Sequence, residues 1–151
     1  RGETATMVGN EALMEQMIYN LVENAIRYND EGGHVLVEVG REAAARPGSA
    51  EAEPNTEGSR EEFAVCPGET APTVVVRVSD DGPGIPTSKR EKIFERFYRL
   101  EKSRSKETGG TGLGLAIVKH GAQRHHGTVE VGGAEGEGAT FTLRFPSGNA
   151  S

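Results

Sequence analysis

The sequence has little of several features that would place it in other protein classes. Cys66 is the only cysteine among 151 residues, so an intrachain disulfide is impossible and a cysteine-based metal cluster is not expected. No run of about 18 apolar residues occurs, which argues against a membrane-spanning helix. The first residues, RGETATMVGN, have neither the apolar core of a signal peptide nor an initiator methionine. These absences predict a piece of a longer protein in a reducing, cytoplasmic setting.

Positive charge is also scarce. The chain has 17 lysines and arginines against 23 aspartates and glutamates, a formal net charge of −6. This field disfavours nucleic acid and anionic membranes as nonspecific partners. The length fits one domain that can bury its own core. We therefore expect residues 1–151 to form a single domain that does not bind nucleic acid.

Hydrophobic periodicity predicts alternating helices and strands. Helices grouped against one face of a mixed, mainly antiparallel sheet would make a two-layer α/β sandwich, with the opposite face polar or covered by a partner domain. Between two of the strands, residues 41–72 are rich in Ala, Glu, Gly, Pro and Ser, which predicts a low-complexity surface insertion with one short strand at 63–66. The expected helices are 10–29, 87–98 and 113–127, and the expected strands are 34–40, 73–79, 128–133 and 139–145, with a further short strand at 3–8.

The first expected helix carries a polar stripe in an otherwise apolar pattern. With Asn20 set at zero, Asn24 falls at about 40°, Arg27 at about −20°, Tyr28 at about 80° and Glu23 at about −60°. A solvated outer face would explain such a stripe, but asparagine weakens a helix compared with Glu, Lys or Gln. Amide oxygens are ligands that Mg²⁺ accepts beside phosphates, an arginine can bind phosphate, and a tyrosine ring can pack on a base.

Two glycine-rich segments follow. In DDGPGIP, Gly82 and Gly84 allow a close approach of the main chain to a ligand, and Asp81 could accept from an exocyclic amine. In GGTGLGLAIVKH, glycines run into a helix whose free N–H groups can bind an anion. A plain turn and a flexible hinge are the simpler interpretations of these segments. The second is not a P-loop, because no Gly-Lys-Ser/Thr follows.

The order and spacing of these motifs are more specific than any one of them. NLVENAIRY, DDGPGI, IFERFYR and GTGLGLAIVK together span residues 20–119. In this order they resemble the N, G1, F and G2 boxes of the ATP-binding catalytic domain of sensor histidine kinases. That domain belongs to a wider family that includes DNA gyrase and the heat-shock chaperone ATPases, and its ATP-binding fold is called the Bergerat type.

The resemblance implies ATP and Mg²⁺ as ligands. It makes Asn24 the main metal ligand with support from Asn20, assigns Arg27 to phosphate and Tyr28 to adenine packing, and makes Asp81 the partner of the adenine amine. Gly82, Gly84 and Ile85 would line the base pocket. The phosphate side would be closed by Arg99, Gly110, Thr111, Gly112, Leu113 and Gly114. The segment 99–109 would be a mobile lid, anchored by Phe94 and Phe97, and Arg96 would contact phosphate or a partner domain.

One position separates transfer from hydrolysis. Hydrolysing relatives carry a glutamate four residues before the metal asparagine, and this chain has Asn20 there. An amide cannot act as a general base, so the resemblance favours transfer to another nucleophile. Asn20 and the neighbouring acid Glu23 are therefore the candidate catalytic residues.

The phosphoryl acceptor is not evident in the chain. None of His34, His120, His125 and His126 lies in a pattern like His-Glu-x-Arg-Thr-Pro. The resemblance therefore implies an upstream dimerisation domain that carries the acceptor histidine, a response regulator as the next partner, a homodimeric and membrane-anchored full-length sensor, and a monomeric fragment. The open alternatives are a serine/threonine kinase of the anti-sigma-factor type, an ATPase of the same superfamily and a degenerate binding module.

Overall fold

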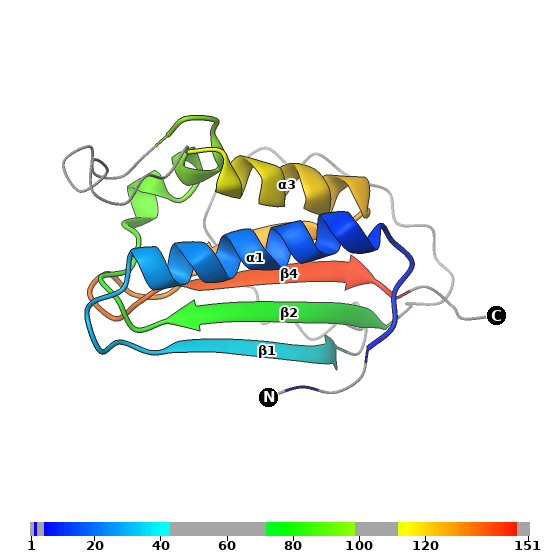
Figure 1. Cartoon of the computed structure of the whole chain (residues 1–151), viewed down its shortest axis with the longest axis horizontal. Helices are drawn as coiled ribbons and strands as arrows, with labels where there is room; N and C mark the ends of the chain where they lie inside the picture. The colour runs from blue at the N-terminus through cyan, green and yellow to red at the C-terminus, as the bar shows by residue number, and fades with distance from the viewer. Residues whose placement is uncertain (1, 3–4, 43–71, 99–111, 148–151) are drawn as a thin grey trace, which may run out of the picture.

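The strands form one antiparallel sheet whose face is covered by two helices (Figure 1). The computed structural model describes residues 2, 5–42, 72–98 and 112–147. Within these residues the sheet has the order β1-β2-β4-β3. Its strands are β1 (Val35–Glu42), β2 (Thr73–Asp80), β3 (Thr128–Gly132) and β4 (Thr140–Pro146), and the covering helices are α1 (Glu11–Arg27) and α3 (Gly114–Arg124). The predicted two-layer α/β sandwich and the terminal hairpin are confirmed.

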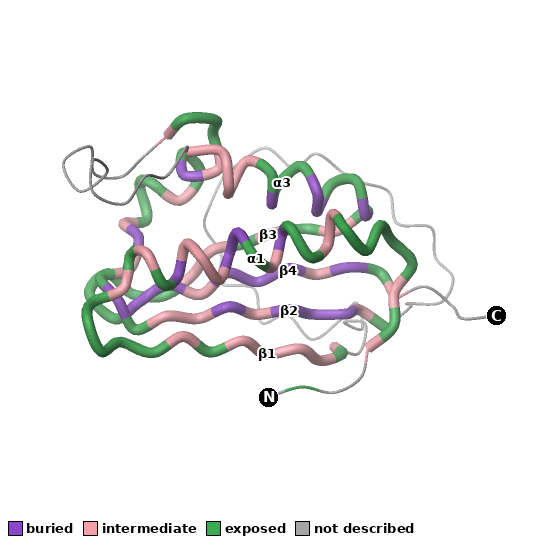
Figure 2. Tube along the Cα trace, in the orientation of Figure 1, coloured by how far each residue is buried: buried purple, intermediate pink, exposed green. Residues whose placement is uncertain are grey.

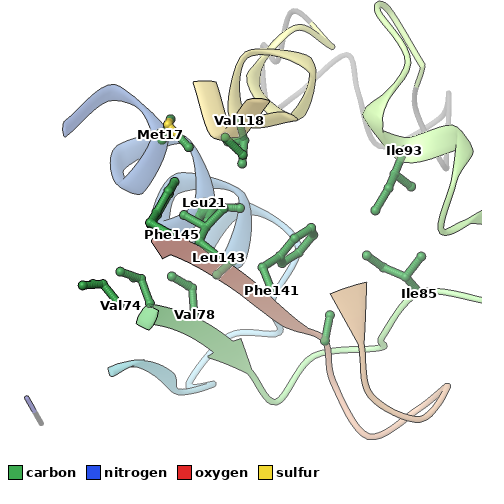
Figure 3. Close-up of a cluster of buried hydrophobic side chains, with 14 residues drawn as sticks. Met17, Leu21, Val74, Val78, Ile85, Ile93, Val118, Phe141, Leu143 and Phe145 are labelled. Carbon is green, nitrogen blue, oxygen red and sulfur yellow. The ribbon is translucent and has the colours of Figure 1, made fainter. Parts of the chain in front are cut away.

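The core lies between the sheet and the two helices. Antiparallel register places Val76 opposite Leu143 and Val78 opposite Phe141, so alternate residues of β2 and β4 face the helices. Figure 2 shows the buried residues running along these two strands and along the inner sides of the helices. In Figure 3, Met17 of α1 and Val118 of α3 lie above the β4 side chains. Burial of this apolar face is the main stabilising contribution to the fold.

The opposite face of the sheet is polar, as expected. Arg144 on β4 pairs with Glu42 at 3.2 Å and with Glu130 at 2.6 Å, and Arg77 on β2 also pairs with Glu42. The hydrogen bond from Arg144, followed by the Coulombic attraction of both arginines, lowers the pKa of Glu42, while the two glutamates raise the pKa of Arg144. Because these side chains are partly exposed, each pair contributes only about 0.2–1 kcal/mol.

His125 ties the end of α3 to the start of α1. The buried imidazole accepts from the backbone N–H of Asn10 through Nε2 at 2.9 Å, and its Nδ1 donates to the carbonyl of Gly121 at 2.7 Å. This arrangement requires a neutral ring with its proton on Nδ1. The Asn10 side chain caps α1 as predicted, accepting from the N–H of Leu13 at 3.0 Å. His125 also packs edge-on against Phe145.

The segment 87–98 differs most from expectation. Instead of one helix it forms two short 3-10 turns, η1 (Thr87–Lys89) and η2 (Lys92–Phe94). Extended backbone at Glu95 ends the second turn, and Phe97 adopts a positive φ of 64°. Only isolated apolar side chains of this segment reach the core, which is too few for the continuous stripe that stabilises a surface helix.

Smaller corrections concern strand ends. β1 continues through Arg41 and Glu42, so the predicted insertion begins later than residue 41. Residues 5–8 form no strand, although Gly2 makes an isolated parallel bridge with Val39. Ile26 is 64% exposed, because on the helical wheel that has Asn20 at zero it falls at about 240°, at the edge of the apolar face of α1. The predicted strand at 63–66 lies outside the described residues.

In the part of the chain that is described, no helix is long and apolar enough to cross a membrane.

Asp81 ties the loop after α1 to the end of β2. Its carboxylate accepts from the backbone N–H of His34 at 2.7 Å and from the Asn29 amide at 3.0 Å, and it lies 3.1 Å from His34 Nδ1. The bond from the His34 backbone, followed by those from the Asn29 and His34 side chains, lowers the pKa of Asp81 to about 2. This carboxylate therefore stays ionised and holds two loops together.

The adjacent histidines at the end of α3 provide a matched test of the His125 contact. His125→Asn should lower the free energy of unfolding by about 2 kcal/mol, because a buried N–H loses its acceptor and the ring leaves Phe145. His126 is exposed with a φ of 56°, a conformation that asparagine tolerates, so His126→Asn should change stability by less than about 0.5 kcal/mol. Urea unfolding measures both, and equal losses would contradict the role of His125.

The hydrogen bonds that Asp81 accepts from Asn29 and His34 predict that the stability of the fold depends on pH. A carboxylate whose pKa is depressed in the folded state contributes stability that is present above its ordinary pKa of 3.8 and is lost as the pH falls toward about 2. Asp81→Asn should therefore lower the urea midpoint at pH 7, and its difference from the wild type should shrink between pH 4 and pH 2.5. A difference that stays constant across this range would show that the ionised carboxylate does not supply the stability.

Candidate functional site

A cavity of about 650 Å³ opens between α1, the end of β2 and the start of α3. Its size is that of a site for a small organic ligand. Figure 3 shows Ile85 and Ile93 facing one another at one end of the core, and both line the cavity. Beyond residues of the predicted site, the lining includes Gln16, Tyr19, Asp80, Pro83, Pro86, Lys89, Ile93, Tyr98, Leu115, Ile117, Glu135, Ala139 and Phe141.

The polar stripe of α1 faces this cavity. Asn20, Glu23, Asn24, Arg27 and Tyr28 all line it. The opposite side of the helix packs on the sheet, so the amphipathic pattern of α1 serves the core with one face and the cavity with the other. The simpler interpretation of the stripe as a plain outer face does not account for its position along the cavity.

Asn20 is the most enclosed polar residue of the stripe. It is 8% exposed, its Nδ2 donates to the carbonyl of Gly114 at 3.3 Å, and its Oδ1 accepts from Gln16 Nε2 at 3.0 Å. Both ends of the amide therefore already have protein partners. This geometry makes Asn20 the link between α1 and the first turn of α3, with its oxygen still close to the cavity.

Glu23 and Arg27 are paired across one helical turn. Arg27 Nη2 donates to Glu23 Oε1 at 2.7 Å, and the Glu23 side chain is 43% exposed. An anionic ligand can recruit the guanidinium from such a partly exposed pair at modest cost. Asn24 lies between them in sequence, and its side-chain amide has no hydrogen bond to another described residue, so its oxygen is available to a ligand.

The two adjacent aspartates at the end of β2 point to different places. Asp80 lines the cavity and Asp81 does not. The Asp80 Oδ1 atom accepts from the N–H of Gly82 at 3.0 Å and from that of Ala139 at 3.4 Å. Asp81 is instead engaged by Asn29 and His34 and lies outside the cavity lining, which does not fit the role against the base that the resemblance implied for it. The strand period could have shown this, because Asp80 shares the helix-covered face with Val76 and Val78.

The glycines of the DDGPGIP turn have distinct roles. Gly84 lines the cavity at a φ of 74°, and a Cβ there would come within 2.7 Å of the Ala134 carbonyl, so only glycine fits. Ile85 lines the cavity as predicted. Gly82 is buried outside the lining and acts through its N–H on Asp80.

The other end of the cavity meets the start of α3. Gly112, Leu113 and Gly114 line it. Among the described residues, no side chain caps the first N–H groups of α3, so these groups and the helix dipole favour an anion at this end. Gly112 has a φ of 73°, and its carbonyl accepts from the N–H of Phe97 at 2.9 Å. Arg99, Gly110, Thr111 and the predicted lid at 99–109 lie outside the described residues.

The aromatic residues before that segment separate into two kinds. Phe94 packs against the core and makes an edge-on contact with Phe141 at 6.3 Å between ring centroids. Tyr98, which the motifs did not single out, packs on the core and lines the cavity. Phe97 is 72% exposed, so only its backbone, bonded to Gly112, can anchor a neighbouring segment. Arg96 is exposed and does not line the cavity.

The donor set fits a metal that arrives with a phosphate ligand. No group of three or more His, Cys, Asp or Glu side chains within the described part of the chain could hold a metal ion alone. Mg²⁺ usually keeps several waters and binds through one or two protein oxygens together with substrate phosphates. The Asn24 amide oxygen, beside Asn20 at the end of the cavity nearest α3, meets that requirement.

Comparisons with known proteins agree with this geometry. The family described as "Histidine kinase-, DNA gyrase B-, and HSP90-like ATPase" matches residues 9–149. The chain is 38% identical over 140 residues to the sensor-like histidine kinase SenX3 of Mycolicibacterium smegmatis, covering 93% of this chain and 29% of that protein. It is 35% identical over 131 residues to the sensor histidine kinase WalK of Bacillus subtilis, covering 87% and 17%. The chain thus spans less than a third of the curated relatives it matches.

Solved structures show the same fold. Full-length ShkA in complex with AMPPNP superposes with a TM-score of 0.64 at 29% identity, covering 98% of this chain and 24% of that one. The mycobacterial sensor histidine kinase MprB gives a TM-score of 0.62 at 24% identity, covering 97% and 80%. The resemblance seen in the sequence to the ATP-binding catalytic domain of sensor histidine kinases is confirmed, and the chain belongs to the family of histidine kinase-, DNA gyrase B- and HSP90-like ATPases.

Proposed function

We propose that this chain binds Mg²⁺-ATP in the cavity beside α1 and supplies its γ-phosphoryl group to a histidine on a dimerisation domain of the same protein. The observation that carries this proposal is the polar stripe of α1, which faces a cavity of nucleotide size and ends against the uncapped first turn of α3. The family match and the AMPPNP complex of a similar protein support it.

The base would lie at the β2 end of the cavity. Asp80 Oδ1 is held by backbone N–H groups, which directs the carboxylate so that its other oxygen can accept from the adenine amine. Tyr28 and Ile85 supply apolar surface beside that position. Asp80 therefore takes the role that the sequence assigned to its neighbour.

The phosphates would lie at the α3 end. Arg27 and the N–H groups of the first turn of α3 supply positive charge there. Asn24 would hold Mg²⁺, with Asn20 orienting the first turn of α3 next to it. When bound, Mg²⁺ neutralises charge on the phosphates. This arrangement would hold the phosphates between α1 and the first turn of α3.

The site favours transfer over hydrolysis. The position that would orient an attacking water carries Asn20, whose amide is already bonded to Gln16 and Gly114. Glu23 is bonded to Arg27, and we propose it as a group that assists the acceptor once a nucleotide draws Arg27 away. An imidazole nitrogen would attack the γ-phosphorus in line, the bond to the bridging oxygen would break, and ADP would leave.

The remaining assignments rest on the relatives. Both SenX3 and WalK are named as sensor histidine kinases, and this chain spans 29% and 17% of them. We propose that a homodimeric protein carries the chain, that membrane anchoring lies outside it, that the domain works on the cytoplasmic side, and that a response regulator receives the phosphoryl group. The fragment alone would be a monomer that binds nucleotide without phosphorylating itself.

The two adjacent aspartates give a matched pair for nucleotide binding. Asp80→Asn should weaken ATP binding about 30-fold or more, because the acceptor of the adenine amine is replaced and its backbone donors lose a charged partner. Asp81→Asn should weaken it by less than about fivefold, since this side chain does not reach the cavity. Calorimetry with Mg²⁺-ATP measures both constants. A larger loss in Asp81→Asn would restore the assignment based on sequence.

The reaction class is tested on the full-length protein that contains this chain. Incubation with ATP labelled in its γ-phosphoryl group should give a phosphoryl group on histidine that is labile in acid and stable in base. Asn24→Ala should lower the labelling rate about 100-fold or more, while the exposed control His126→Asn should keep it. Acid-stable phosphoserine on a partner protein would point to the anti-sigma-factor type of kinase, and release of free phosphate alone would point to an ATPase.

A further inference from the structure

A side chain outside the cavity, that of Arg90, joins two of the cavity walls. Arg90 follows η1, and its Nε donates to the carbonyl of Ile85 at 3.4 Å while its Nη2 donates to the carbonyl of Gly133. Ile85 belongs to the DDGPGIP turn, and Gly133 begins the loop between β3 and β4. The Arg90 guanidinium therefore joins a wall of the proposed base pocket to a loop that is distant in sequence. Its planar shape lets Nε and Nη2 donate at the same time.

The loop joined by Arg90, residues 133–138, reaches the base end of the cavity. The N–H of Gly136 donates to the carbonyl of Pro83 at 2.7 Å. Glu135 at its tip and Ala139 just after it line the cavity. A Cβ on Gly138 would overlap the carbonyl of Asp80, so this loop lies directly against the turn and has no room to shift inward. It forms an outer wall of the base pocket.

The same loop orients the side chain proposed to bind adenine. The N–H of Asp80 donates to the carbonyl of Ala139 at 2.9 Å, and the N–H of Ala139 in turn donates to Asp80 Oδ1 at 3.4 Å. A movement of the loop would thus change the direction of the Asp80 carboxylate. Arg90 fixes the far end of the loop at Gly133, which connects it through Ala139 to Asp80.

We propose that Arg90 is a positioning residue for base selection, which locks loop 133–138 against the DDGPGIP turn and so aims Asp80 at the exocyclic amine of adenine. This inference rests on the adenine role proposed above for Asp80. Arg90 does not line the cavity, unlike Arg27. Its loss acts on recognition of the base and leaves the phosphate contacts in place.

The test compares ATP with inosine triphosphate, which carries a carbonyl oxygen in place of the amine. The wild-type chain prefers ATP, because the 6-amine of adenine can donate to Asp80 whereas the carbonyl oxygen at the same position of inosine can only accept. Arg90→Ala lowers the affinity for ATP by about tenfold and changes that for inosine triphosphate by less than about twofold, so the preference between the two nucleotides collapses. Arg90→Lys keeps the charge but offers one nitrogen, and it restores only part of the preference.

Lys92→Ala is the matched control, since it removes an exposed cation two residues away that does not line the cavity. It leaves both affinities at the wild-type value. Thermal melting followed by circular dichroism identifies the variants that fold. If Arg90→Ala does not fold, the two affinities of Arg90→Lys test the inference. Equal weakening of both nucleotides, or an unchanged preference in a folded Arg90 variant, overturns the inference. A wild-type chain that binds neither nucleotide overturns the proposed function instead.

Discussion

The position of α1 between the sheet and the start of α3 determines what the rest of the structure can do. Its apolar face packs on β1 and β2 and against α3, where the chain buries Met17, Leu21 and Ala25. That packing leaves the opposite stripe facing the cavity. Asn20 then holds the first turn of α3 beside this stripe through its hydrogen bond to the carbonyl of Gly114. The end of α3 that we propose to bind the phosphates is thereby held beside α1, which carries Asn24, the proposed Mg²⁺ ligand.

The base end depends on a second constraint, the alternation of side chains along β2. Asp80 is the last residue of the strand and faces the helix layer, whereas Asp81 leaves the strand and points to the loop after α1. Of these two adjacent carboxylates, Asp80 thus lines the cavity and Asp81 holds the loop after α1. The loop between β3 and β4 closes the same end, and the absence of side chains at Gly84 and Gly138 allows the close approach.

Much of this architecture could be predicted from the sequence, for physical reasons that also explain the failures. α1 and the strands have strong periodicity and clear caps, so Asn10 and the terminal hairpin are where they were expected. The segment after Pro86 has the composition of a helix, but it forms only short 3-10 turns because few of its side chains reach the core. Tyr98 and Glu135 reach the cavity only through tertiary packing, and no local pattern identified them.

The central claim is that one cavity holds the base at the end of β2 and the phosphates at the start of α3. Amide chemical shifts of the chain during a titration with AMPPNP and Mg²⁺ test this most directly. The account predicts saturable changes concentrated at Gly84 and Ile85 at one end and at Gly112 to Gly114 at the other, with little change on the outer face around Arg77. Changes confined to the outer face, or the absence of saturable changes, would contradict it.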